Sequence, residues 1–208
     1  MKNSWKIAAG ICCILLSVTC LAMDQWQTAR GIAEKITRMQ VIAHSDSEED
    51  QALKLAVRDT LAAEVREITE GETDPYRARE LIAEALPQIE NAASQTVYAA
   101  GYAYPVRAAV ENVVYPFRDY GTFALPAGEY TALRVIIGEG AGHNWWCVAF
   151  PGLCEPYARI DETCLSARET AFITGDAPQI RFYLAERLQA LYVRLKASHP
   201  ILLSGNAR

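Results

Sequence analysis

Apolar residues recur every three or four positions through the second quarter of the chain, which predicts two amphipathic helices. The first begins in the acidic run Ser45–Asp50, where a serine followed three positions on by a glutamate is typical of a capping box. The second begins with Pro75 at its first helical position, and Pro87 is expected to kink or restart it. The two apolar stripes are Leu53, Val57, Leu61, Val65 and Ile68, and then Ala78, Leu81, Ile82, Ala85, Leu86 and Ile89.

Elsewhere the apolar period is two, as in strands, and glycine and proline separate the segments. The predicted strands are Arg38–His44, Tyr104–Val114, Arg118–Phe123, Tyr130–Ile137 and Trp145–Phe150. A last helix is predicted from Asp176 to about Ser198. One strand, then helices, then a run of strands and a final helix predict an α+β fold: a mostly antiparallel sheet with helices packed on one face.

The N-terminus differs from the rest of the chain. Lys2 and Lys6 precede Ile7–Met23, an uncharged run of 17 residues. A helix of that length spans about 25 Å, which fits an export signal or a short membrane anchor. Small residues at Cys20 and Ala22 permit cleavage after Ala22, and both the cleaved and the anchored form remain open. The sequence around Cys20 fits a lipoprotein signal badly.

Residues 1–23 are therefore predicted to be a signal peptide or anchor, and residues 24–208 a single exported α+β domain. In either form the domain lies outside the cytoplasm, and membrane contact is expected through residues 7–23 if they are not cleaved. The net charge of −5, without a stripe of lysine and arginine, argues against a nucleic-acid partner. We expect no cofactor.

Export changes the interpretation of the cysteines. The predicted domain contains Cys147, Cys154 and Cys164, and two of three cysteines are expected to pair in an oxidising compartment. A Cys147–Cys154 bridge would close a loop of eight residues and contribute roughly 2–2.5 kcal/mol by chain entropy. A zinc site that adds His143 has none of the usual tight ligand spacings, so the disulfide is the better prediction.

Two stretches contain residue types found in catalytic sites. His44, Ser45 and Asp46 are those of a serine triad, but triad members converge from separate parts of a fold, and a strand end leading into a helix cap explains them without chemistry. His143 and Cys147 are those of a cysteine hydrolase, yet they lie four positions apart at a turn entering a strand and do not easily meet. A cell-wall or peptide hydrolase that uses Cys147 or His143 is the alternative function.

Trp145 and Trp146 are adjacent in a predicted strand, so they point to opposite faces of the sheet. One of them is expected to lie at the surface or under another element. An exposed tryptophan beside a rigid loop is typical of a binding hot spot.

Three segments together resemble one family. They are VIAHSDS (Val41–Ser47) with the following DQALKLAVRD, LPAGEY (Leu125–Tyr130) and GEGAGHNWWCVAFPGLC (Gly138–Cys154). They resemble stage II sporulation protein R of endospore-forming bacteria, over most of the chain from about Met39 to Cys154. One departure is Gly152, where the family commonly has a second proline.

The resemblance implies a signalling protein and not an enzyme. Members are secreted across the forespore membrane into the space between the two membranes. There they activate a membrane-embedded aspartic protease, which processes the pro-form of the early mother-cell sigma factor. We therefore expect that protease as the partner, no catalytic residues, and a candidate partner-binding set next to the candidate disulfide of Cys147 and Cys154. The set is Asn144, Trp145, Trp146, Pro151 and Leu153.

Overall fold

The structure is a computed structural model, and it describes residues 4–152 and 164–176. The elements follow in the order α1 (Ser4–Lys35), β1 (Thr37–Ile42), α2 (Glu48–Ile68), α3 (Pro75–Glu84), α4 (Leu86–Ala99), β2 (Val106–Tyr115), β3 (Arg118–Asp119), β4 (Ala124–Leu125), β5 (Gly128–Ile137), β6 (Asn144–Phe150) and α5 (Ala167–Thr174). The predicted C-terminal helix lies outside the described residues.

Four strands form one mixed sheet in the order β2-β5-β1-β6. Two of its pairings, β2 with β5 and β1 with β6, are antiparallel, whereas β1 and β5 are parallel. Every residue of β1 is buried, as expected for an interior strand covered on both faces. The predicted α+β class is therefore confirmed.

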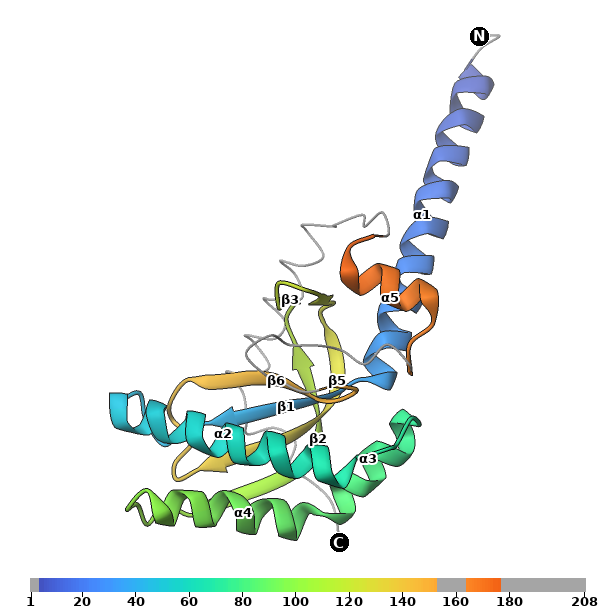
Figure 1. Ribbon diagram of the computed structural model, residues 1–208. Coiled ribbons are helices and arrows are strands. Elements are labelled where there is room, and N and C mark those ends of the chain that lie inside the picture. The colour runs from blue at the N-terminus through green and yellow to red at the C-terminus, as the bar shows by residue number, and fades with distance from the viewer. Residues whose placement is uncertain (1–3, 153–163, 177–208) are drawn as a thin grey trace, which may run out of the picture.

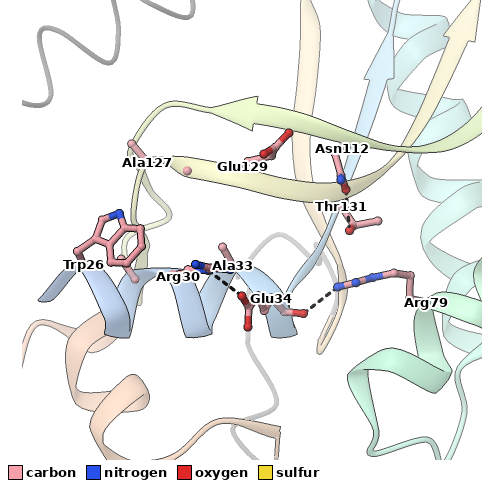
Figure 2. Close-up of a pocket in the computed structure, with 11 residues that line it drawn as sticks. Trp26, Arg30, Ala33, Glu34, Arg79, Asn112, Ala127, Glu129 and Thr131 are labelled. Carbon is pink, nitrogen blue, oxygen red and sulfur yellow. Dashed lines mark hydrogen bonds and ion pairs between the residues drawn. The ribbon is translucent and has the colours of Figure 1, made fainter. Parts of the chain in front are cut away.

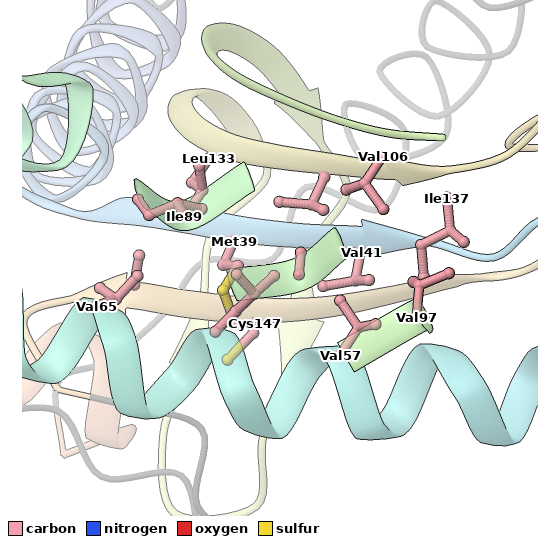
Figure 3. Packing of buried hydrophobic residues seen from close by; sticks show 14 of the residues in the cluster. Met39, Val41, Val57, Val65, Ile89, Val97, Val106, Leu133, Ile137 and Cys147 are labelled. Carbon is pink, nitrogen blue, oxygen red and sulfur yellow. The ribbon is translucent and has the colours of Figure 1, made fainter. Parts of the chain in front are cut away.

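The helices α2, α3 and α4 lie along one face of the sheet, and the main core is between them and the strands (Figures 1 and 3). The predicted apolar stripe of α2 supplies Leu53, Val57, Leu61 and Val65 to this core, and they meet Met39 and other residues of the strands. Because the stripe was predicted from helical spacing alone, its burial confirms the helix and its orientation.

Capping residues determine where these helices begin. The N-cap of α2 is Ser47, whose hydroxyl accepts a hydrogen bond from the Asp50 N–H. The third helical residue is thus an aspartate, and the predicted box with a glutamate is wrong in detail. Asp74 caps α3, with Pro75 directly after it. Pro87 lies in the first turn of α4, where a new helix begins. Both proline predictions are confirmed.

The predicted strand Arg118–Phe123 is wrong. The chain makes a short hairpin there, in which β3 and β4 contribute two residues each. Gly121 has a positive φ of 87°, and its N–H donates to the Asp119 carboxylate at 2.8 Å. An extended strand cannot contain this turn.

α1 is one continuous helix that extends away from the sheet (Figure 1). The helix continues without a break past the apolar run Ile7–Met23 to Lys35. Among the described residues, α1 is the one helix long and apolar enough to cross a membrane, and the segment that meets this test is Ala9–Lys35. Such a helix fits a signal sequence as well as an anchor.

A second, smaller core lies on the other face of the sheet, where α1 ends and α5 packs against it. Ile32 of α1 and Ile36, which directly follows the helix, are fully buried there. Glu169 of α5, itself buried, accepts a hydrogen bond from Lys35 Nζ at 2.6 Å, and Arg168 pairs with Asp24. The last part of α1 is thus integral to the domain. α5 was not predicted from the sequence, although Ser166 and Glu169 form a full capping box.

Glu169→Ala is expected to lower the free energy of unfolding by about 2 kcal/mol, because it removes a charge-assisted bond at the contact of α1 with α5. Burial raises the pKa of Glu169, but the bonds from Lys35 and Ser166 outweigh burial and hold that pKa below its usual value. A depressed carboxyl pKa stabilises the fold at neutral pH, and this contribution is lost as the pH falls through the folded-state pKa. Urea titration of the wild type and the variant at pH 7 and pH 3.5 should show a smaller difference at pH 3.5. An equal difference at both pH values would contradict the ionic part of the argument.

Candidate functional site

Two loops that are distant in the sequence meet at one end of the sheet. One joins β1 to α2 and contains His44–Ser47; the other is the turn Gly138–His143 between β5 and β6. The N–H of Ala141 donates to the His44 carbonyl at 3.1 Å, and that of Gly142 donates to the Ala43 carbonyl at 3.0 Å. We call this pair of loops the clasp. It joins two of the three segments that resemble the sporulation family.

The clasp is closed by an exposed pair, His143 and Asp46. Asp46 Oδ1 accepts a bond from the His143 N–H at 2.6 Å and lies 2.5 Å from His143 Nδ1. The backbone bond, opposed by desolvation and aided by the ring contact, holds the pKa of Asp46 below its usual value. Asp46 therefore stays ionised through the neutral and mildly acidic range and keeps the turn attached to the β1–α2 loop.

His44 lies inside the clasp. Its ring stacks on Tyr104 with centroids 4.1 Å apart, and its Nδ1 accepts a bond from the Glu139 N–H at 3.1 Å. Gly138 and Gly142 permit the close approach: a Cβ at Gly138 would overlap the His44 ring, and one at Gly142 would overlap the Ser45 carbonyl. These glycines, which separate two of the predicted strands, thus also allow the turn to pack against the β1–α2 loop.

Lys54 connects the clasp to α2. It is almost fully buried, and its Nζ donates to the His143 carbonyl at 3.0 Å and to Gln51 Oε1 at 2.5 Å. Burial lowers the pKa of Lys54, while the charge of Asp46 acts in the opposite direction. α2 therefore orients the turn that leads into β6.

The two tryptophans of β6 have different surroundings. Trp145 is 36% exposed, and the guanidinium of Arg58 on α2 lies 4.5 Å from its ring centroid. Trp146 is half-buried on the other face of the sheet, edge-on to Tyr115 at 4.9 Å. Trp145 is thus a partly exposed aromatic surface beside the clasp, supported from one side by a cation.

The other predicted site residues are separated. Asn144 is half-buried at the start of β6, and Pro151 is buried after its end. Leu153 lies outside the described residues, so the binding set stays a prediction.

The structure does not bring the residues of the hydrolase alternative together. Cys147 is fully buried in the main core facing α2, beside Met39 (Figure 3). His143 is exposed and bonded to Asp46. Among the described residues, the two side chains thus form no nucleophile–base pair.

Cys147 is disulfide-bonded, whereas Cys12, Cys13 and Cys20 are free thiols, and the Cys164 thiol donates to the Thr73 carbonyl at 2.9 Å. Cys154 lies outside the described residues, so its pairing with Cys147 stays a prediction. Alkylation of the denatured protein, before and after reduction, followed by intact-mass analysis, should show two more labelled cysteines after reduction. The Cys154→Ser variant should remove that difference; equal labelling of the wild type before and after reduction would contradict the bridge.

A separate cleft of about 600 Å³ lies between α1, α3 and the start of β5 (Figure 2). Trp26 lies at one end and Arg79 at the other. Arg30 pairs with Glu34 at 2.9 Å, and Arg79 donates to the Glu34 carbonyl at 2.8 Å. None of the predicted site residues lines this cleft.

Sequence reasoning missed the polar partners of the site: Asp46 as the partner of His143, and Lys54 and Arg58 on α2. Lys54 and Arg58 are four positions apart, beside the buried Leu53 and Val57, which is a signal for side chains at the rim of the helix–sheet contact. The strand end that Lys54 and Arg58 contact depends on the order of the strands in the sheet, and this order cannot be predicted from helical spacing.

These features define a class: an α+β protein whose apolar N-terminal helix fits a signal sequence or a membrane anchor. Comparison with known proteins gives the family. The family described as Stage II sporulation protein R matches residues 33–159. The Stage II sporulation protein R of Bacillus subtilis (strain 168) is 33% identical over 148 residues, which are 68% of this chain and 66% of that relative. No solved structure matches the chain. The chain belongs to the Stage II sporulation protein R family, as the resemblance predicted.

Proposed function

We propose that this protein is an exported signal of endospore formation that binds and activates a membrane-embedded aspartic protease. The activated protease then processes the pro-form of the early mother-cell sigma factor. The protein acts by contact and performs no reaction itself. The observation that carries the proposal is the family match, which includes both loops of the clasp.

The chain is proposed to act outside the cytoplasm, in the space between the two membranes or anchored at its border. The apolar part of α1 supports export in both forms. The part of α1 after Met23 stays attached to the domain in both forms, through Asp24 with Arg168 and Lys35 with Glu169. Cleavage after Ala22 would therefore leave the domain intact.

The proposed contact surface is the clasp together with Trp145. Trp145 presents its exposed part beside a turn that is fixed by backbone bonds and by Lys54. A rigid aromatic group loses little conformational entropy on binding, which favours it as an anchor for a partner.

The test is reconstitution in a bacterium that does not form spores. The full chain, the protease and the pro-sigma factor are produced together, and the size of the sigma factor is followed. Cleavage is expected only when all three are present. Cleavage at the same rate without this chain, or none with it, would overturn the proposal.

Trp145→Ala is expected to weaken activation strongly in that assay. Loss of a hot-spot aromatic costs about 2 kcal/mol of binding free energy, roughly a thirtyfold loss of affinity. Tyr98→Ala is the matched control, because Tyr98 is an aromatic residue of α4 that is 82% exposed. Wild-type activation by a folded Trp145→Ala variant would place the contact elsewhere. Trp146→Ala should be compared at equal folded amounts, because its loss also removes packing on Tyr115.

A further inference from the structure

The bond between His44 and Glu139 requires one protonation state of the imidazole. The Glu139 N–H points at His44 Nδ1, at 3.1 Å, so that nitrogen must carry a lone pair. The ring proton of the neutral form is then on Nε2. It is the one hydrogen bond of this ring among the described residues.

A second proton on the ring would have to sit on Nδ1. Two donors would then face each other where a bond had been, and the close packing of Gly138 against the ring leaves little room to adjust. Stacking on Tyr104 holds the ring on its other side. Movement of the turn would relieve the repulsion between the two donors.

The charged and titratable groups around the clasp are Asp46 from the β1–α2 loop, Asp50 and Lys54 from α2, Tyr102 and Tyr104 before β2, and Glu139 and His143 from the turn. Asp50 is engaged by Ser45 Oγ at 2.5 Å, and Lys54 by the His143 carbonyl. Burial, with the charge of Asp50, raises the pKa of Tyr104, so this phenol stays neutral. Because the pKa of Asp46 is lowered, that carboxylate also keeps its charge down to mildly acidic pH.

We propose that the clasp is sensitive to pH. Its turn Gly138–His143 separates from the β1–α2 loop at Glu139 when His44 takes up a proton on Nδ1. Imidazole is the side chain whose charge ordinarily changes between pH 5 and 8. The second histidine responds in the opposite sense, since protonation of His143 strengthens its contact with Asp46. Acid therefore releases the middle of the turn while its end at His143 stays attached. The site next to Trp145 becomes less ordered at low pH, and this change of conformation does not depend on the proposed partner.

Hydrogen exchange of the full chain in detergent micelles tests the inference. Protection factors, corrected for the intrinsic pH dependence of exchange, are measured at pH 8 and pH 5 for a peptide that covers 138–143. We expect protection to fall by about five- to tenfold at pH 5, as for the loss of one net hydrogen bond. A peptide from the buried middle of α2 should keep its protection.

Two variants separate the histidines. His44→Phe keeps an aromatic ring on Tyr104 but cannot accept a bond, so protection of the turn should be low at both pH values. His143→Phe should still show the decrease between pH 8 and pH 5. A pH-dependent decrease that persists in His44→Phe, or an unchanged wild type, would overturn the proposal. Nitrogen-15 shifts of the His44 ring test it without any variant: an Nδ1 that carries the proton at pH 8 would also refute it.

Discussion

Arg38→Ala is expected to lower the free energy of unfolding by about 3–4 kcal/mol, whereas Arg38→Met should change it by no more than about 1 kcal/mol. Arg38, on β1, is fully buried in the second core. Its guanidinium lies 4.3 Å from the ring centroid of Tyr115 and 5.1 Å from that of Tyr130. Nη2 donates to the Tyr120 hydroxyl at 2.7 Å, but Nε and Nη1 have no hydrogen-bond partner among the described residues.

The tyrosines do not neutralise this cation. Burial raises the pKa of both Tyr115 and Tyr130, so the phenols keep their protons. Within the described part of the chain, Arg38 forms no ion pair. Contact with aromatic faces contributes about 0.5–2 kcal/mol. Burial of a charge without a counterion costs several kcal/mol. The cost of burial is at least as large as this gain, so the charge adds no net stability, and the volume of the side chain decides the result.

The two variants separate volume from charge. Methionine fills most of the space of the arginine stem and has no charge to desolvate, whereas alanine leaves a cavity among Tyr115, Tyr120 and Tyr130. Urea unfolding of the full chain in micelles, followed by circular dichroism, measures both. If Arg38→Met costs as much as Arg38→Ala, the guanidinium itself stabilises the fold, and the account of its charge is wrong.

The helices and most of the strands could be predicted because their signals are local. Apolar spacing located α2, and the prolines at 75 and 87 located the beginnings of α3 and α4. The hairpin of β3 and β4 was missed because one glycine, Gly121, adopts a positive φ inside a run that is otherwise typical of a strand. The capping box of α5 was also a local signal, and it could have been found.

The sheet order was not predictable in this way. The parallel pairing of β1 with β5 joins segments separated by three helices and the strands β2, β3 and β4, and no local period encodes that pairing. The geometry of the site depends on the sheet order and was therefore not predictable either. The Trp145–Trp146 pair and the glycine turn could be predicted from the sequence, but the contact of His143 with Asp46 exists only because β6 pairs with β1.

Gly142→Ala is expected to lower the free energy of unfolding by about 2–3 kcal/mol, or to detach the turn from the β1–α2 loop. An added Cβ would meet the Ser45 carbonyl closer than real Cβ atoms approach any group, and a backbone atom cannot rotate away. The Gly142 N–H would also lose its bond to the Ala43 carbonyl as the turn moved. Ala141→Ser is the matched control, because Ala141 is the exposed neighbour in the same turn.

Two measurements distinguish the possible results of Gly142→Ala. Urea unfolding reports global stability, and hydrogen exchange of the peptide 138–143 reports the clasp. If the turn detaches while the domain stays folded, activation of sigma-factor processing should fall together with the protection of the turn. Such a variant would show that the conformation of the clasp, and not only the presence of Trp145, is needed for signalling. Normal stability and normal protection in Gly142→Ala would mean that the two loops are not in contact as described.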